Sequence, residues 1–211
     1  MKYFALLVAG MLLTGCGAKK DNPSPAVATT PPTQAVESID SALAGVDLTP
    51  FKIGNRWIYE ISIMDTTTGR LVPDLLDTFT VSRDTTINGE LWHMIDGMGP
   101  KGSLAINREG GQWIIAPDGK PYLIAKFPAA AGDEFSGMGG QVINRLEKTG
   151  VEITVPGGTF YCYQYSQIFG PQRRLTYNYF APGVGLVKME IMGADRNTPV
   201  MVSRLMKAEL K

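Results

Sequence analysis

The sequence predicts an all-β protein: a curved antiparallel sheet of about eleven strands, arranged as a sandwich or as a complete or half barrel. Two observations predict this class. From Phe51 onward, short runs rich in β-branched and aromatic residues follow one another, as is typical of strands. Clusters of Gly, Pro, Asn and Asp separate the runs at the spacing of tight turns, and helical periodicity is almost absent.

The first half of this region contains six of the predicted strands. Asn88-Gly89 gives the clearest turn signal, because this pair is preferred in two-residue type I′ hairpins. Glu109-Gly110-Gly111 and Pro117-Asp118-Gly119 mark later turns. The strands are predicted at residues 56–64, 78–87, 90–95, 103–108, 112–116 and 121–127.

The second half contains five more predicted strands. They lie at residues 141–155, 159–169, 174–181, 185–193 and 200–209, and the first is either one strand or two with a break near Gly150. Pro156 ends that segment because proline cannot donate to a strand ladder. Pro182-Gly183 separates a later pair, and glycine there permits a positive φ. These turn positions therefore predict structural roles.

The chain begins with a short export signal. Lys2 supplies a positive charge, and residues 3–13 form an uncharged apolar run that is shorter than the roughly 20 residues of a membrane span. The run ends at Leu13-Thr14-Gly15-Cys16, which resembles the lipobox of bacterial lipoprotein precursors. That resemblance implies a lipidated Cys16 that anchors the protein in the bacterial cell envelope. Because Gly17 stands where an Asp would retain such a protein at the inner membrane, it implies the outer membrane.

The predicted organisation has three parts. Residues 1–15 form a signal peptide that is removed, residues 16–47 form a lipidated tether, and residues 48–211 form a single all-β domain. The tether is rich in Pro, Thr and Ala and has too little apolar surface to order itself. At most one short helix is expected before the domain, since four apolar residues recur at helical spacing: Val36, Ile39, Leu43 and Val46.

Composition excludes some partners and crosslinks. The chain has 20 basic and 20 acidic residues, and no basic block beyond Arg173-Arg174, so nucleic acid is not an expected partner. With lipid on Cys16, Cys162 is the one remaining cysteine and an intramolecular disulfide is impossible. Cys162 is expected to be a small buried hydrophobe, with an intermolecular or redox role as the alternative.

Several segments between Phe51 and about Leu210 share features of one family. They are Phe51-Lys52-Ile53-Gly54-Asn55-Arg56-Trp57-Ile58-Tyr59, Phe127-Pro128 with Gly132-Asp133-Glu134-Phe135, Val155-Pro156-Gly157-Gly158-Thr159-Phe160, and Tyr179-Phe180-Ala181-Pro182-Gly183-Val184-Gly185-Leu186-Val187. Together they resemble the TapB-like family of exported bacterial proteins, many of which are lipoproteins. Phe135 replaces the usual Trp of the second segment, and Phe180 is inserted in the last. The resemblance implies a fold and a compartment, and no particular chemistry.

No catalytic or cofactor pattern is complete. His93 is the single histidine and no nucleophile-elbow motif accompanies it, while His93 and Cys162 alone are too few for a zinc site. The run from Gly97 to Gly102 matches G-x-G-x-x-G, but a strand follows it rather than the helix that dinucleotide binding needs. The sequence therefore predicts a protein that is not an enzyme and has no metal and no cofactor.

Five tyrosines are the most distinctive surface candidates. Tyr161, Tyr163 and Tyr165 share one face by the period of two, and Tyr177 and Tyr179 share a face of the next strand. If the strands pair in the right register, the five form one patch. Such a patch suits a ligand platform or cross-strand packing, and the third alternative is that no common patch forms.

Two functions remain from the sequence. The first is a non-catalytic binding protein whose curved sheet holds an unknown hydrophobic or amphipathic ligand. The alternative is a structural or accessory envelope lipoprotein that acts through contacts with other envelope proteins. A large apolar cavity would favour the first, and a filled core with an exposed apolar or tyrosine patch would favour the second.

Overall fold

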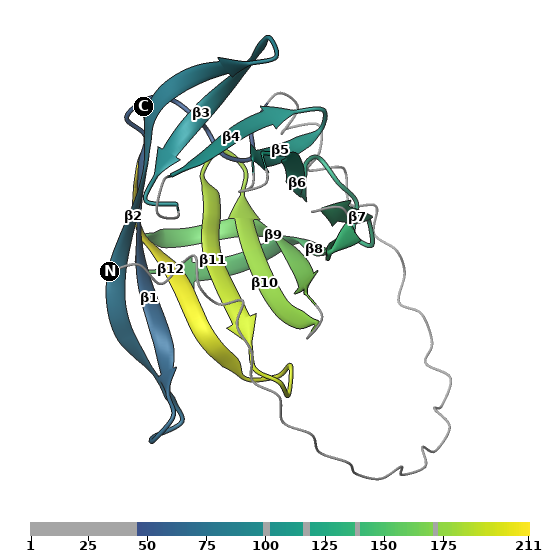
Figure 1. The fold of residues 1–211 in the computed structure, drawn as a ribbon. Helices are drawn as coiled ribbons and strands as arrows, with labels where there is room; N and C mark the ends of the chain where they lie inside the picture. Colours follow the sequence, from purple (N-terminus) through teal and green to yellow (C-terminus); the bar gives the residue numbers. More distant parts are fainter. Residues whose placement is uncertain (1–45, 99–101, 116–118, 138–139, 171–172) are drawn as a thin grey trace, which may run out of the picture.

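The computed structural model describes residues 46–98, 102–115, 119–137, 140–170 and 173–211 (Figure 1). The predicted signal peptide, the lipidated Cys16, almost all of the tether and the expected short helix lie outside these residues. Within the described part the chain forms twelve β-strands and no α-helix, so the predicted all-β class is confirmed. None of the described residues form a helix of the length and hydrophobicity that crossing a membrane requires.

All twelve strands belong to one antiparallel sheet, in the order β6-β5-β4-β3-β2-β1-β12-β11-β10-β9-β8-β7. The first six strands are β1 (Arg56–Asp65), β2 (Arg70–Ile87), β3 (Glu90–Asp96), β4 (Ser103–Arg108), β5 (Gly111–Ile115) and β6 (Pro121–Lys126). The second six are β7 (Glu134–Gly137), β8 (Val142–Val155), β9 (Gly158–Phe169), β10 (Arg174–Ala181), β11 (Gly185–Met192) and β12 (Pro199–Glu209). Each strand pairs with its neighbour in sequence except at the two edges, and β1 also pairs with β12.

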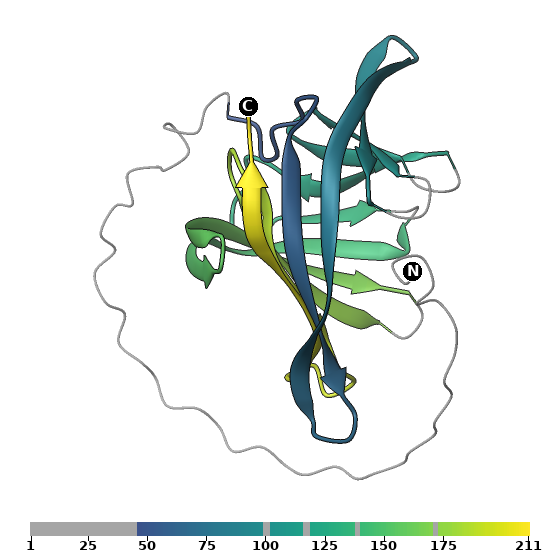
Figure 2. The same ribbon diagram turned by 90° about the vertical axis from the view of Figure 1, so that its left-hand side faces the viewer.

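The sheet curls until its two edges approach each other. Figures 1 and 2 show β4–β6 curving round toward β7 and β8, and β6 and β7 lie in contact. Register shifts occur in several strand pairs, for example between Ile58 and Tyr59 and between Gln112 and Trp113. Such bulges bend and twist strands, so they let one sheet close into a nearly complete barrel.

β2 is much longer than the strand predicted at 78–87. Its second half pairs with β3 from Thr80 onward, while residues 70–77 pair with β1 alone and form the hairpin that projects at the bottom of Figure 1. Pro73 lies in this projecting half. Proline is tolerated there because the strand has a free edge on one side.

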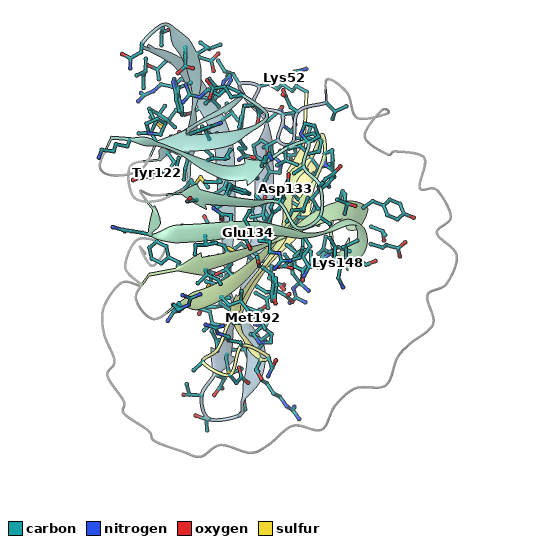
Figure 3. All side chains as sticks on the ribbon, turned by 90° about the vertical axis from the view of Figure 1, so that its right-hand side faces the viewer. Lys52, Tyr122, Asp133, Glu134, Lys148 and Met192 are labelled. Atoms are coloured by element: carbon teal, nitrogen blue, oxygen red, sulfur yellow. The ribbon has the colours of Figure 1, made fainter. Side chains whose placement is uncertain are left out.

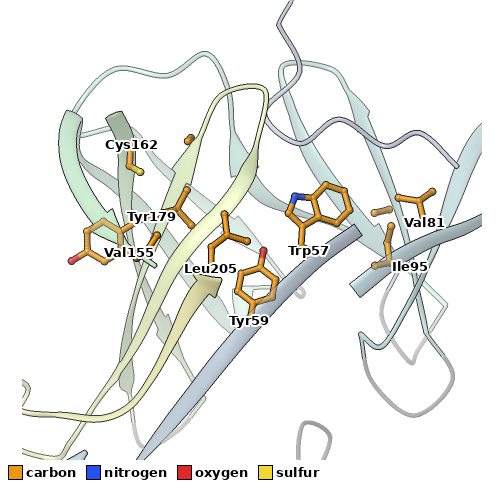
Figure 4. Packing of buried hydrophobic residues seen from close by; sticks show 11 residues of the cluster. Trp57, Tyr59, Val81, Ile95, Val155, Cys162, Tyr179 and Leu205 are labelled. Carbon is orange, nitrogen blue, oxygen red and sulfur yellow. The ribbon is translucent and has the colours of Figure 1, made fainter. Parts of the chain in front are cut away.

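The barrel has two clusters of buried side chains. The first includes Trp57, Tyr59, Val81, Ile95 and Leu205, and Figure 4 shows Trp57 between Tyr59 on one side and Val81 and Ile95 on the other. The second cluster consists of Leu48, Ala125, Phe127, Leu146, Tyr163, Tyr165 and Phe180. Leu48 precedes every strand, so the domain core includes the chain that enters the barrel.

Candidate functional site

An apolar cavity lies inside the curve of the sheet. The space that the centre of a water molecule can reach is about 70 Å³. Residues from β5 and β10 both line it, although these strands lie far apart in the sheet order, and this places the cavity inside the barrel. Its walls are Trp57, Tyr59, Phe79, Ile95, Met98, Ala105, Gln112, Ile114, Ile124, Phe180 and Leu186, with Thr49 and Phe51 from the chain before β1. We call it the inner cavity.

The polar atoms of the inner cavity wall bind to the protein itself. Trp57 Nε1 donates to the Val184 carbonyl at 2.7 Å, and the Tyr59 hydroxyl donates to the Leu186 carbonyl at 2.8 Å. Burial raises the pKa of Tyr59 well above its ordinary value, so this hydroxyl stays protonated. Thr49 Oγ1 donates to Gln112 Oε1 at 2.7 Å. The wall therefore offers apolar surface rather than free charge.

Residues 47–51, which we call the entry strap, run along the inner cavity, which Thr49 and Phe51 line. The Asp47 carbonyl accepts a hydrogen bond from the Gly183 amide at 2.8 Å, and the Thr49 carbonyl accepts one from Asn107 Nδ2 at 2.7 Å. The strap therefore reaches from the β10–β11 turn to β4. Gly185 leaves room for it, because a β-carbon there would lie 2.9 Å from the Thr49 side chain.

A second hollow lies on the other side of Phe51. It has a volume of about 360 Å³, is open to solvent, and is lined by Asp47, Phe51, Glu90, Leu91, His93, Ile106 and Asn107. We call it the outer groove. The Phe51 ring stacks on His93 with ring centroids 5.7 Å apart, and His93 Nδ1 lies 2.7 Å from Asp84 Oδ1. Lys52, the residue after the strap, lies at the top of Figure 3, and Met192 at the end of β11 lies toward the bottom.

The strand register does not bring the five tyrosines into one patch. Tyr163 lies directly opposite Phe180 and Tyr165 opposite Asn178, whereas Tyr179 lies opposite Gln164. Because residues directly opposite in an antiparallel pair share a face, Tyr163 and Tyr165 face away from Tyr179. The same register places Tyr177, opposite Ser166, on the Tyr179 face, and Tyr161 is 68% exposed near the β8–β9 turn.

Most of these tyrosines pack in the core. Tyr163 and Tyr165 belong to the second cluster, with the Tyr163 ring edge-on to Phe127 at 5.2 Å, and Tyr179 belongs to the first cluster. The Tyr179 hydroxyl donates to Glu190 at 3.0 Å. Burial raises the pKa of Tyr165 and of Tyr179 above the ordinary tyrosine value. Their arrangement fits the packing alternative.

The other candidate residues take structural positions in the described part of the chain. His93 bonds to Asp84 and to no hydroxyl or thiol of a described residue. Gly97 has φ +90° and a β-carbon there would lie 2.0 Å from the Thr78 carbonyl oxygen, so the chain turn requires glycine. Cys162 is a free, buried thiol, and burial raises its pKa to about 12. Among the described residues no group of three metal-ligating side chains occurs.

Sequence reasoning missed the entry strap and both hollows. The one signal for them is the pair Asn107 and Gln112, which are polar residues within apolar strands. Both bind the strap, through the Thr49 carbonyl and the Thr49 hydroxyl respectively. A polar side chain at an inward position of a strand needs a buried partner, and the partner here is a segment that carries no strand pattern.

The fold and the site define a class: a nearly closed antiparallel barrel with a small apolar interior and an internal strap. No family model and no curated protein matches the sequence, so the TapB-like resemblance stays a prediction. A candidate exported protein with a YmcC-like fold from Bacteroides fragilis is similar in fold, with a TM-score of 0.52 at 13% identity over 78% of this chain and 100% of that chain. A candidate lipoprotein from Parabacteroides distasonis gives a TM-score of 0.49 at 16% identity over 78% of this chain and 99% of that chain.

Proposed function

We propose that this protein is an exported, lipid-anchored binding protein of the bacterial cell envelope. It holds the apolar part of a hydrophobic or amphipathic ligand inside its barrel and performs no chemistry on it. The observation that carries the proposal is the inner cavity, which is small at about 70 Å³ but has an almost wholly aromatic and aliphatic wall, in which Trp57 and Tyr59 bind their polar atoms to backbone carbonyls. Apolar hollows of this kind favour apolar groups over water.

The binding is tested on the chain starting at Gly17, which carries no lipid. We expect native mass spectrometry to find a retained ligand, and the neutral probe N-phenyl-1-naphthylamine to fluoresce in the stripped protein. Ala105→Leu should lower the affinity for this probe by about tenfold or more, because the added side chain fills the inner cavity. Ala208→Leu is the matched control, since Ala208 is half-buried and does not line the cavity. Equal binding by the two variants would contradict the proposed site.

The anchor rests on Cys16 and on the apolar run before it. The likeness to a candidate exported protein supports export. In cells fed an alkyne fatty acid, the wild-type protein should be labelled and sediment with the outer membrane, and Cys16→Ser should do neither. Equal labelling of the two proteins would exclude lipid attachment at Cys16.

The second candidate function is an accessory lipoprotein that acts through protein contacts. The exposed apolar residues of the projecting β1–β2 hairpin favour it: Ile63, Leu71, Val72 and Leu76, of which Leu76 is 66% exposed. Ile63 lies directly opposite Val72, so these two share one face of the hairpin. If this function holds, Val72→Glu should fail to rescue a strain that lacks the protein, while the isolated variant keeps its stability and binds the naphthylamine probe as before.

A further inference from the structure

We propose that Phe51 is a gate between the inner cavity and the outer groove, and that the joined space takes a single-chain amphiphile with an ammonium head group. The alkyl chain would lie in the inner cavity and the ammonium in the outer groove. This inference rests on the proposed binding function and names its ligand class.

The two hollows follow one another along the same strands. On β3, Ile95 lines the inner cavity and Leu91 and His93 line the outer groove, and these three residues share a face by the period of two. On β4, Ala105 lines the inner cavity and Asn107 the outer groove in the same way. Phe51 lines both hollows, so its ring is the partition between them.

The sizes of the hollows favour a partition that moves, because an alkyl chain needs more space than the inner cavity offers. Sites for small ligands usually have about 300–1,000 Å³. The inner cavity has only about 70 Å³, whereas the outer groove beyond Phe51 has about 360 Å³. With the Phe51 ring turned aside, the two become one elongated site that is apolar at its inner end and polar at its outer end. That polarity matches a molecule with one alkyl chain and one polar head.

The ring of Phe51 can turn while the entry strap stays in place. Both carbonyls that precede it are bound: Asn107 Nδ2 donates to the Thr49 carbonyl, and Asn55 Nδ2 donates to the Pro50 carbonyl at 2.7 Å. Gly54 is held by a backbone bond to Val81 at 2.8 Å. The ring itself is half-buried and rests on His93. A change of side-chain rotamer therefore opens the passage without breaking any of these hydrogen bonds.

The charges of the outer groove select the head group. Asp47 and Glu90 line it, and the carboxylate of Asp84 binds His93. Arg108 forms an ion pair with Glu90 and stacks on Trp92 and Trp113, 5.4 and 4.9 Å from the ring centroids. Asp47 has no ion-pair partner among the described residues. The groove therefore repels an anionic head and attracts a cationic one.

Asn107 adds a second reason for a donor-rich head group. Its Nδ2 donates to the Thr49 carbonyl, whereas its Oδ1 is buried and has no hydrogen-bond partner among the described residues. A buried acceptor without a donor is costly and rare in native proteins. A primary ammonium carries three N–H donors, so one group can serve both the Asp47 carboxylate and Asn107 Oδ1.

The experiment compares two probes of equal chain length, dodecylamine and dodecanoate, below their micelle-forming concentrations. Both compete with N-phenyl-1-naphthylamine for the chain starting at Gly17. We expect dodecylamine to bind about tenfold more tightly than dodecanoate, and Asp47→Asn to remove this preference. Equal affinities of the wild-type protein for the two probes would refute the ammonium head group.

The gate is tested by stopped-flow association of dodecylamine. Phe51→Ala and Phe51→Leu should each speed association by about tenfold, since both remove the ring from the passage. Phe135→Ala is the matched control: Phe135 is also half-buried and lines neither the inner cavity nor the outer groove. Equal association rates for the wild type and all three variants would refute the gate and leave the binding function intact. If neither the wild type nor any variant binds any of the probes, the proposed binding function itself is refuted.

Discussion

Replacing Leu48 by alanine tests whether the entry strap belongs to the core of the domain. Leu48 is 2% exposed and packs with Phe127, Leu146, Tyr163 and Phe180. Replacing a buried leucine by alanine costs about 2–5 kcal/mol, and the cost is highest where the surroundings cannot collapse into the space.

The structure favours the upper part of that range. The second cluster contains rings held edge-on to one another, for example Tyr165 against Phe180 at 5.9 Å. Rings fixed in this way have few ways to fill the volume that a leucine leaves. We therefore expect Leu48→Ala to lower the free energy of unfolding by about 3–5 kcal/mol. In a domain of this size, about 3 kcal/mol corresponds to a fall in Tm of roughly 6–12 °C.

Urea unfolding followed by tryptophan fluorescence measures the change, with thermal melts by circular dichroism as a second probe. Val46→Ala is the matched control because Val46 lies two residues earlier and is exposed, so it should change the free energy by less than about 0.5 kcal/mol. If the free energy of unfolding of Leu48→Ala lies within about 0.5 kcal/mol of the wild-type value, the strap is not part of the core. The strap would then not be a fixed wall of the inner cavity.

Three further predictions concern Trp57, the two glycines of the β10–β11 turn, and Cys162. In urea melts, Trp57→Ala should lower the free energy of unfolding by about 3–5 kcal/mol. Trp57→Phe should lower it clearly less, because it removes only the indole hydrogen bond and one of the two fused rings. Equal losses for the two variants would show that the ring volume does not matter. Gly185→Ala should destabilise more than Gly183→Ala although both glycines have positive φ, since a β-carbon at Gly185 meets Thr49 at 2.9 Å, whereas one at Gly183 has 3.6 Å to Val46; the reverse order of Tm values would contradict this. At pH 8, Cys162 should react with iodoacetamide only as fast as the protein unfolds, because burial raises its pKa to about 12, and fast labelling of the folded protein would refute this. The raised pKa of Cys162 also makes stability depend on pH. Above the ordinary thiol pKa of about 8.5 this thiol ionises only in the unfolded chain, so the free energy of unfolding falls as the pH rises from there toward 12.

Local chemistry predicts the turns and the strands that they join. Asn88 and Gly89 have φ of 53° and 84°, and Ile87 lies opposite Glu90, so the predicted two-residue hairpin is confirmed. Gly183, with φ 76°, follows Pro182 in the turn that the sequence predicts between β10 and β11. These features follow from two adjacent residues, which explains why they can be predicted without knowing the rest of the fold.

Features that depend on a sheet edge escape the same reasoning. The strand β7 (Glu134–Gly137) has four residues at the edge of the sheet, and no alternation is visible in so short a segment. The first half of β2 contains Pro73 and Asp74, which normally indicate a loop. Both segments are stable as strands because a neighbouring strand supplies the ladder on one side while the other side is free.

For the tyrosines, the sequence predicts which face each takes within a strand and leaves open whether the faces of two strands coincide. Alternation places Tyr163 and Tyr165 on one face, and the structure agrees. Whether Tyr179 joins them depends on register, and a shift of one residue reverses every face of a strand. The pairing of Tyr163 with Phe180 rather than with Tyr179 sets that register, and it brings Phe180 to the second cluster and to the inner cavity.

The entry strap is hardest to predict because hydrogen bonds rather than apolar periodicity hold it. Composition predicts that the tether ends at residue 47. In the structure, the carbonyl of that residue, Asp47, accepts a hydrogen bond from the Gly183 amide of the domain. A segment that lines the inside of a barrel must satisfy its buried carbonyls, and Pro50, the fourth of its five residues, has no N–H to offer a neighbouring strand. The donors therefore come from outside the strap: Gly183 and Asn107, which are distant in sequence, and the side chain of Asn55, which binds the Pro50 carbonyl. Because Thr49 and Phe51 of the strap line the inner cavity, we expect Asn107→Ala, which removes one side-chain donor to the strap, to speed the association of N-phenyl-1-naphthylamine in stopped-flow measurements; an unchanged rate would contradict this role of the strap.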